Sequence, residues 1–189
     1  MRETQTWRGS WFIGVERGVV EGWTPSRGLV IYLTVGGGRT WAASQPLTPP
    51  FKTACVDCIA MHADGIRAFG STLLVSTWQD VGSTAKYVLN STDGGATWSY
   101  VASAKDPGNN VDFVTATRWL QLIGPRQSVE TTDAGASWHR YASDYSQAAP
   151  VSANFDFADS VVGYGTVRGE IYRTVDGGLH WTTIHTPGT

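Results

Sequence analysis

The sequence predicts an all-β fold, a β-propeller with four blades of four antiparallel strands each, and three observations support this prediction. An eight-residue pattern, Ser/Thr-x-Asp-x-Gly-x-Ser/Thr-Trp, which tolerates His180 at its seventh position, occurs three times from residue 91 onward, at intervals of 40 and 43 residues. Short segments rich in Val, Thr and aromatic residues lie between the copies. No window of eleven or more residues keeps the apolar spacing of a helix. A period of about 40 to 45 residues is the length of one propeller blade.

The repeated pattern has three complete copies and one incomplete copy. The complete copies span 91–98, 131–138 and 174–181, and the incomplete copy at 34–41 has Gly36 in place of the Asp. An Asp two residues before a Gly can accept backbone hydrogen bonds and close a turn, while the Gly takes a positive φ without steric cost. The Trp anchors the resulting hairpin. We therefore predict a structural role for the residues Asp93, Gly95, Trp98, Asp133, Gly135, Trp138, Asp176, Gly178 and Trp181.

Each repeat is expected to supply four consecutive strands. The first repeat is expected to form strands at 7–16, 19–23, 29–34 and 40–43. The second is expected to form them at 53–61, 66–76, 86–90 and 97–102, with 78–85 as a long polar link. The third and fourth repeats are expected to form strands at 110–115, 119–123, 128–131, 137–141, 151–159, 161–166, 170–174 and 180–184. We predict a single propeller domain over 1–189, with blades at about 1–45, 46–104, 105–145 and 146–189.

Composition argues against several classes of protein. The net charge is −2 and the Arg residues do not cluster, so there is no basic patch to bind nucleic acid. No apolar run reaches the 18 residues of a transmembrane helix. The first five residues lack the apolar stretch of a signal peptide. The protein is therefore expected either to stay inside the cell or to have lost a leader.

The repeats resemble those of the Asp-box (BNR) β-propellers, and most closely the photosystem II assembly-factor family with its bacterial relatives. The repeat of that family combines Phe-x-Asp, Gly-Trp, Gly-x-Ile and a Thr-x-Asp-Gly-Gly-x-Thr-Trp box. The fourth repeat follows this plan at Phe157-Ala158-Asp159, Gly163-Tyr164, 169–174 and 176–178. The resemblance implies a binding or assembly scaffold of the propeller type, and it favours an exported or periplasmic location.

The chain departs from this family in two respects. Its third repeat has Thr115 where the family usually has Asp. Members of the family close a ring of about six or more blades, within the usual range for propellers, whereas this sequence has four repeats. A four-bladed monomer, a homodimer closing an eight-bladed ring and a fragment of a longer protein are the alternatives. We favour the monomer because an open ring would leave two sheet edges unpaired.

Four acidic residues provide the candidate ligand site. The first strand of each blade lines the channel of a propeller, and counting back from each motif Trp aligns Glu16, Asp57, Asp112 and Asp156. Strand alternation directs each carboxylate away from its apolar neighbours. One hypothesis is that they bind a cation or a cationic ligand, with Ca²⁺ at Asp57, Asp112 and Asp156, because oxygen ligands suit Ca²⁺ or Mg²⁺. The alternative is that they are solvated channel residues or loop caps. No other cofactor is expected.

Two further features have less specific interpretations. Cys55 and Cys58 precede His62, but the set lacks the second ligand pair of a zinc site and the adjacent His of a haem site. A disulfide and two buried thiols both remain open. The link between the second repeat's two middle strands, 78–85, begins with Trp78, a loop-face candidate that could stack on a sugar ring. A core position for Trp78 is the alternative that we favour.

The chemistry of the chain favours binding over catalysis. Sialidases of the Asp-box family take their first active-site arginine from a Phe/Tyr-Arg-Ile-Pro segment, which this sequence lacks. There is no Ser/His/Asp nucleophile motif, phosphate loop or His-rich metal signature. We predict a noncatalytic scaffold that engages a protein, a carbohydrate or a small ligand at the channel mouth or loop face. The alternative is a carbohydrate-active protein, either lectin-like or a divergent glycosidase of sialidase-like type.

Overall fold

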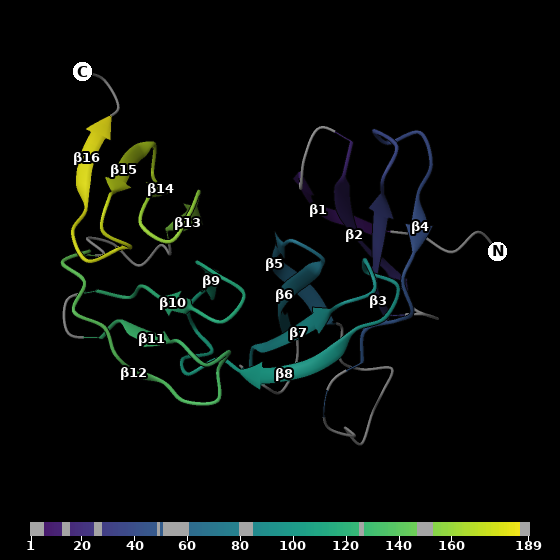
Figure 1. The fold of residues 1–189 in the computed structure, drawn as a ribbon, viewed down its shortest axis with the longest axis horizontal. Coiled ribbons are helices and arrows are strands. Elements are labelled where there is room, and N and C mark those ends of the chain that lie inside the picture. The colour runs from purple at the N-terminus through teal and green to yellow at the C-terminus, as the bar shows by residue number, and fades with distance from the viewer. Residues whose placement is uncertain are drawn as a thin grey trace. The chain divides into compact units, whose positions relative to one another are not determined.

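The chain folds into four antiparallel sheets of four strands (Figure 1). The computed structural model describes residues 6–12, 16–24, 28–48, 50, 61–79, 85–124, 127–146 and 153–185. Within each sheet the strands follow one another in chain order, as in a propeller blade. The predicted fold class, an all-β propeller with four blades in this chain, is confirmed. Within the described ranges, no helix is long and apolar enough to cross a membrane.

The strands have the following bounds. Blade 1 contains β1 (Thr6–Phe12), β2 (Gly18–Thr24), β3 (Gly28–Thr34) and β4 (Ala42–Ala43). Blade 2 contains β5 (Met61–Phe69), β6 (Thr72–Gln79), β7 (Tyr87–Ser91) and β8 (Ser99–Ser103). Blade 3 contains β9 (Asp112–Phe113), β10 (Trp119–Gln121), β11 (Val129–Thr131) and β12 (His139–Arg140). Blade 4 contains β13 (Asn154–Phe157), β14 (Gly163–Val167), β15 (Glu170–Thr174) and β16 (Thr182–His185).

The chain packs as two compact units, residues 1–104 and 105–189, with two blades in each. The core of the first unit joins blades 1 and 2 through Val19, Leu29, Ile31, Leu47, Met61, Ile66, Val75, Tyr87 and Leu89. The core of the second unit joins blades 3 and 4 through Val114, Leu120, Leu122, Tyr141, Tyr145, Ala153 and Phe157. Burial of these apolar side chains holds each pair of blades together. That all four blades form one domain stays a prediction.

Equivalent positions in the four blades follow from strand register. The first residue of each repeated motif pairs with one residue of the second strand, in the pairs Thr34 and Gly18, Ser91 and Leu73, Thr131 and Trp119, and Thr174 and Gly163. We call the sheet face that carries these pairs the leading face of the blade, and the opposite face the trailing face. All four motif hydroxyl residues are buried, with at most 4% of their surface exposed.

The structure corrects the first strands of blades 1 and 2. β1 ends at Phe12, whereas a strand was predicted over 7–16. β5 spans Met61–Phe69, whereas a strand was predicted over 53–61, most of which lies outside the described residues. A two-residue turn at Gly70 and Ser71 joins β5 directly to β6, and Gly70 has a φ of 62°. This hairpin was not predicted because the expected strand over 66–76 includes Gly70, whose positive φ closes the turn.

Candidate functional site

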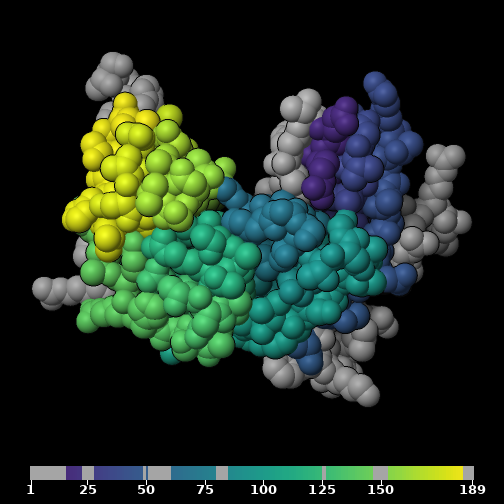
Figure 2. Space-filling model, viewed as in Figure 1, coloured from purple at the N-terminus to yellow at the C-terminus, as the bar shows by residue number. Residues whose placement is uncertain are grey.

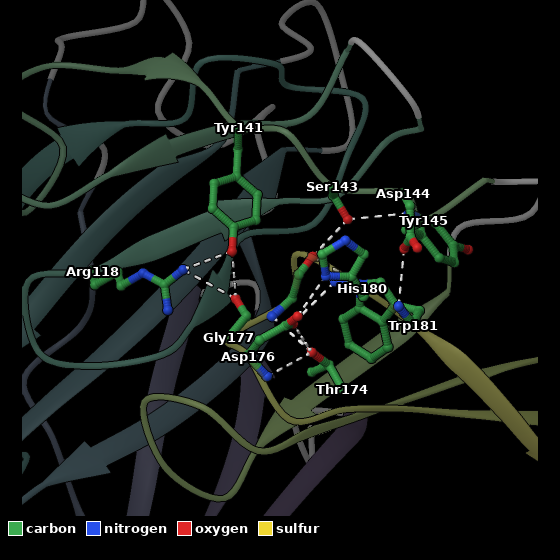
Figure 3. Close-up of polar contacts among 11 residues, drawn as sticks. Arg118, Tyr141, Ser143, Asp144, Tyr145, Thr174, Asp176, Gly177, His180 and Trp181 are labelled. Atoms are coloured by element: carbon green, nitrogen blue, oxygen red, sulfur yellow. Dashed lines mark hydrogen bonds and ion pairs between the residues drawn. The ribbon is translucent and has the colours of Figure 1, made fainter.

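The motif at 174–181 forms a tight turn between β15 and β16, shown in Figure 3. The Thr174 hydroxyl donates to Asp176 Oδ1 at 2.8 Å and accepts from the Gly178 amide at 2.9 Å. Asp176 Oδ1 also accepts from the His180 amide at 3.0 Å, and its Oδ2 lies 2.6 Å from His180 Nδ1. The Trp181 indole donates to the Gly178 carbonyl at 3.0 Å. We call this arrangement an Asp turn.

The two preceding copies repeat the carboxylate bonds of this turn with a hydroxyl in place of the imidazole, whereas the indole nitrogens of Trp98 and Trp138 have no hydrogen-bond partner among the described residues. The Asp93 carboxylate accepts from Ser91 Oγ at 2.7 Å and from Thr97 Oγ1 at 2.6 Å. Asp133 accepts from Thr131 Oγ1 at 2.7 Å and from Ser137 Oγ at 2.6 Å. The incomplete copy lacks the carboxylate but keeps the other bonds of the turn: Thr34 Oγ1 accepts from the amides of Gly36 and Gly38, and the Trp41 indole donates to the Gly38 carbonyl at 3.1 Å.

These hydrogen bonds stabilise the ionised carboxylates. The side-chain and backbone donors of Ser137, with Thr131, lower the pKa of Asp133 to about 2. Hydrogen bonds from the side chain and backbone of Thr97 and from Ser91 lower the pKa of Asp93 further. Burial works against ionisation of Asp176, but hydrogen bonds from His180 and Thr174 outweigh it and bring its pKa to about 2. All three carboxylates therefore stay charged and hydrogen-bonded near neutral pH, which suits a structural role better than acid–base chemistry.

Within each unit, the Asp turn of the second blade is also bound by the segment that follows the first blade. In the second unit, the Asp144 amide donates to the Leu179 carbonyl at 2.8 Å, and the Ser143 hydroxyl donates to the Gly178 carbonyl at 2.6 Å (Figure 3). In the first unit, the Gln45 amide donates to the Ala96 carbonyl at 2.8 Å, at the equivalent place in its Asp turn. The motif thus connects blade 1 to blade 2 and blade 3 to blade 4, as well as closing a hairpin.

Arg118 makes a second connection between blades 3 and 4, and no pattern in the sequence predicts it. Its guanidinium donates to Glu130 Oε1 at 2.5 Å within blade 3. In blade 4 it donates to the carbonyls of Ser160 at 3.1 Å and Gly177 at 3.0 Å. The Tyr141 hydroxyl accepts from Arg118 at 3.0 Å and donates to the same Gly177 carbonyl at 2.8 Å (Figure 3). These partners lie 12 to 59 residues from Arg118 in the chain, so no local pattern reveals them.

Two of the four predicted carboxylates occupy equivalent strand positions. Asp112 on β9 pairs with Leu120, and Asp156 on β13 pairs with Tyr164. Strands β9 and β13 lie in contact within the second unit. Asp112 is buried, with 8% of its surface exposed, whereas Asp156 is exposed.

Tyr145 lies close enough to Asp112 for the charge of that carboxylate to affect it. The pKa of Tyr145 is raised, mainly by burial and to a smaller extent by the negative charge of Asp112. Its buried hydroxyl has no hydrogen-bond partner among the described residues.

The other two carboxylates are not aligned with this pair. Glu16 lies exposed in the bend before β2, and its carbonyl accepts from the Gly37 amide of the first Asp turn. Thr117 and Val161 make the same carbonyl contact to Ala134 and Gly177, so they are the counterparts of Glu16. The count back from Trp41 failed because the loops differ in length. Asp57 lies outside the described residues, and so do Cys55 and Cys58.

The structure does not test the predicted calcium site, because one of its three residues lies outside the described ranges. Its residues were Asp57, Asp112 and Asp156, of which only the last two are described. No group of three or more His, Cys, Asp or Glu side chains suited to a metal ion occurs within the described ranges. Ca²⁺ binding stays a prediction.

Trp78 lies on strand β6 and not in a link. It pairs with His62 of β5, and the two rings stack with centroids 4.8 Å apart at an angle of 35°. His62 is buried and its Nδ1 lies 3.4 Å from Glu21 Oε1, which connects blades 1 and 2. The indole is half-buried, so Trp78 combines a packing role with partial exposure.

Comparisons with known proteins support the fold. No protein-family model and no curated protein sequence matches the chain. Among solved structures, YCF48 bound to D1 peptide is 16% identical in sequence to this chain, with a TM-score of 0.57. The match covers 100% of this chain and 56% of the YCF48 chain. YCF48 from Cyanidioschyzon merolae is 17% identical (TM-score 0.52, covering 100% and 58%). A mutant of Aleuria aurantia lectin, in complex with alpha-methyl-L-fucoside, is 16% identical in sequence, with a TM-score of 0.54. This match covers 97% of this chain and 62% of the lectin chain. The chain therefore spans 56% to 62% of these proteins.

Proposed function

We propose that this protein is a noncatalytic β-propeller scaffold of the Asp-box type, which binds a macromolecular or small ligand at its channel mouth or loop face. The observation that carries this proposal is the state of the repeated carboxylates. Asp93, Asp133 and Asp176 are held in turns by three or more hydrogen bonds each, which suits a structural role better than proton transfer.

Similar propellers support a binding role. YCF48 has been determined with a D1 peptide, and the Aleuria aurantia lectin with a fucoside. Because one propeller architecture hosts different functions, the fold itself does not identify the ligand. Asp112 and Asp156 provide negative charge on adjoining first strands, so we favour a ligand with positive charge, such as a basic segment of a protein.

A peptide array probed with the labelled protein tests this proposal. We expect capture of basic peptides and little capture of acidic ones. Asp156→Asn removes an exposed charge and should weaken binding of the captured peptides about tenfold or more. Glu16→Gln is the matched control, because Glu16 is also exposed but lies in a bend outside the strand position of Asp156. Equal losses in both variants, or capture that ignores peptide charge, would contradict the assigned site.

Carbohydrate binding is the alternative function, supported by the likeness in fold to a fucose-binding lectin. A glycan array and a screen on fluorogenic glycosides separate the two proposals. Saturable sugar binding without turnover would favour a lectin. Turnover that disappears in Asp156→Asn would overturn the noncatalytic scaffold and indicate a glycosidase that uses this carboxylate.

A further inference from the structure

The seventh residue of the repeated motif can change its charge in blade 4 but not in blades 2 and 3. This residue is His180 in blade 4, whereas it is Thr97 in blade 2 and Ser137 in blade 3. Both hydroxyls donate to the Asp of their turn, and His180 Nδ1 lies 2.6 Å from Asp176 Oδ2. A hydroxyl stays neutral near neutral pH, whereas an imidazole gains or loses a proton there. The Asp turn of blade 4 therefore contains a group that responds to pH.

The residues on either side of His180 bind the segment that follows blade 3. The Asp144 amide donates to the Leu179 carbonyl at 2.8 Å, and Asp144 Oδ1 accepts from the Trp181 amide at 2.9 Å (Figure 3). We call these two bonds the Asp144 clasp. Figure 2 shows blade 4, in yellow-green to yellow, packed directly on blade 3, in green. The clasp contributes to the contact between these two blades, and His180 lies between the two residues that it binds.

Two carboxylates from different segments act on the imidazole. Asp176 belongs to the same turn, and Asp144 belongs to the segment between β12 and β13. The hydrogen bond and the charge of Asp176 raise the pKa of His180, and the charge of Asp144 acts in the same direction. Arg118 also brings a positive charge to this turn, through its bond to the Gly177 carbonyl. Protonated His180 adds to the charge that offsets the two carboxylates, whereas neutral His180 does not.

The connection between blades 1 and 2 has the same build with neutral residues. The Gln45 amide donates to the Ala96 carbonyl at 2.8 Å, so Gln45 occupies the place that Asp144 has in the second unit. The seventh residue of this Asp turn is Thr97. The acidic residue and the imidazole of the second unit are thus replaced by an amide and a hydroxyl, and neither of these titrates near neutral pH. The first unit therefore provides an internal reference without the titratable pair.

We propose that the Asp144 clasp is a pH-sensitive connection between blades 3 and 4, which protonated His180 strengthens and neutral His180 weakens. A group whose pKa is raised by folding contributes stability that is complete below its ordinary pKa and is lost as pH rises through the folded value. The clasp is therefore strongest in mildly acidic solution. Because the imidazole is exposed, solvent screens its charge and the change is modest. The connection between blades 1 and 2 does not share this response.

Amide hydrogen exchange of the whole chain, followed by NMR, tests this proposal. Each exchange rate is compared with that of an unstructured peptide at the same pH, which removes the intrinsic effect of pH on exchange. Between about pH 5 and about pH 8, the protection of the Asp144 and Trp181 amides should fall about threefold. The Gln45 amide is the internal control, and its protection should change by less than about 1.5-fold.

Two variants separate the imidazole from the rest of the clasp. His180→Thr gives blade 4 the seventh residue of blade 2, so it keeps a donor for Asp176 and should abolish the pH response of both amides. Asp144→Gln gives the connecting segment the residue of the first unit, and it should reduce the response while the bond from its amide to Leu179 stays. Circular dichroism reports whether each variant is folded, and His180→Gln replaces His180→Thr if the latter is not.

Three outcomes overturn the proposal. The first is protection of the Asp144 and Trp181 amides that does not change with pH, in a wild-type protein whose His180 resonances titrate. The second is a loss of protection that persists in the folded neutral variant of His180. The third is an equal loss at the Gln45 amide, because that would indicate a response of the whole chain and not of the clasp.

Discussion

Replacing Arg118 with Met should destabilise the second unit, because it removes every polar bond that Arg118 makes while keeping a long apolar stem. The guanidinium donates to Glu130, to the Tyr141 hydroxyl and to two carbonyls of blade 4, and the side chain is 20% exposed. A hydrogen bond involving a charged group contributes roughly 1.5 to 3 kcal/mol, and bonds within one network do not add. His139 Nε2 stays 3.0 Å from Glu130 Oε2, so this carboxylate keeps one hydrogen-bond partner. We expect a net loss of about 2 to 4 kcal/mol.

Urea denaturation measures this loss. With a dependence on urea of about 2 kcal/mol per molar, the midpoint should fall by about 1 to 2 M. The exposed Arg39→Met is the control and should change stability by less than about 0.5 kcal/mol. Hydrogen exchange adds a local readout, since the Asp turn of blade 4 loses its contact to Arg118 and its amides should exchange faster.

The measured stability of Arg118→Met tests whether the bonds of Arg118 connect blades 3 and 4. A loss below about 0.5 kcal/mol would show that the guanidinium bonds do not stabilise the folded unit. A double-mutant cycle with Glu130→Gln adds a quantitative check, and a coupling energy of roughly 0.5 to 3 kcal/mol is expected for groups in direct contact. A coupling near zero would refute the Glu130 contact even if Arg118→Met itself is destabilising.

Three further outcomes follow from the geometry. Gly165→Ala places a Cβ 2.7 Å from the Phe155 ring and should cost about 1 to 3 kcal/mol by calorimetry, whereas Gly36→Ala, with no atom within 4 Å, should change stability little. The hydrogen bond to Asp176 raises the pKa of His180. The protonated imidazole therefore contributes its full stabilisation below the ordinary pKa of 6.5, and this contribution is lost as pH rises through the higher pKa of the folded state. In Asp176→Asn, NMR titration should show the pKa of His180 return toward 6.5. Asp133 has a lowered pKa of about 2, so its contribution is present above its ordinary pKa and lost as pH falls toward 2; Ser137→Ala should raise this pKa in carboxyl NMR spectra.

The sequence predicted the parts of the fold that depend on local bonds. An Asp turn is closed by hydrogen bonds within eight residues, so the pattern itself specifies the hairpin. The number of blades could be predicted for the same reason, because each repeat of the pattern marks one blade. The alignment of Glu16 failed because counting residues assumes equal loops, whereas register depends on where each strand ends. Arg118 and the stacking of Trp78 on His62 escaped prediction because their partners come from other strands.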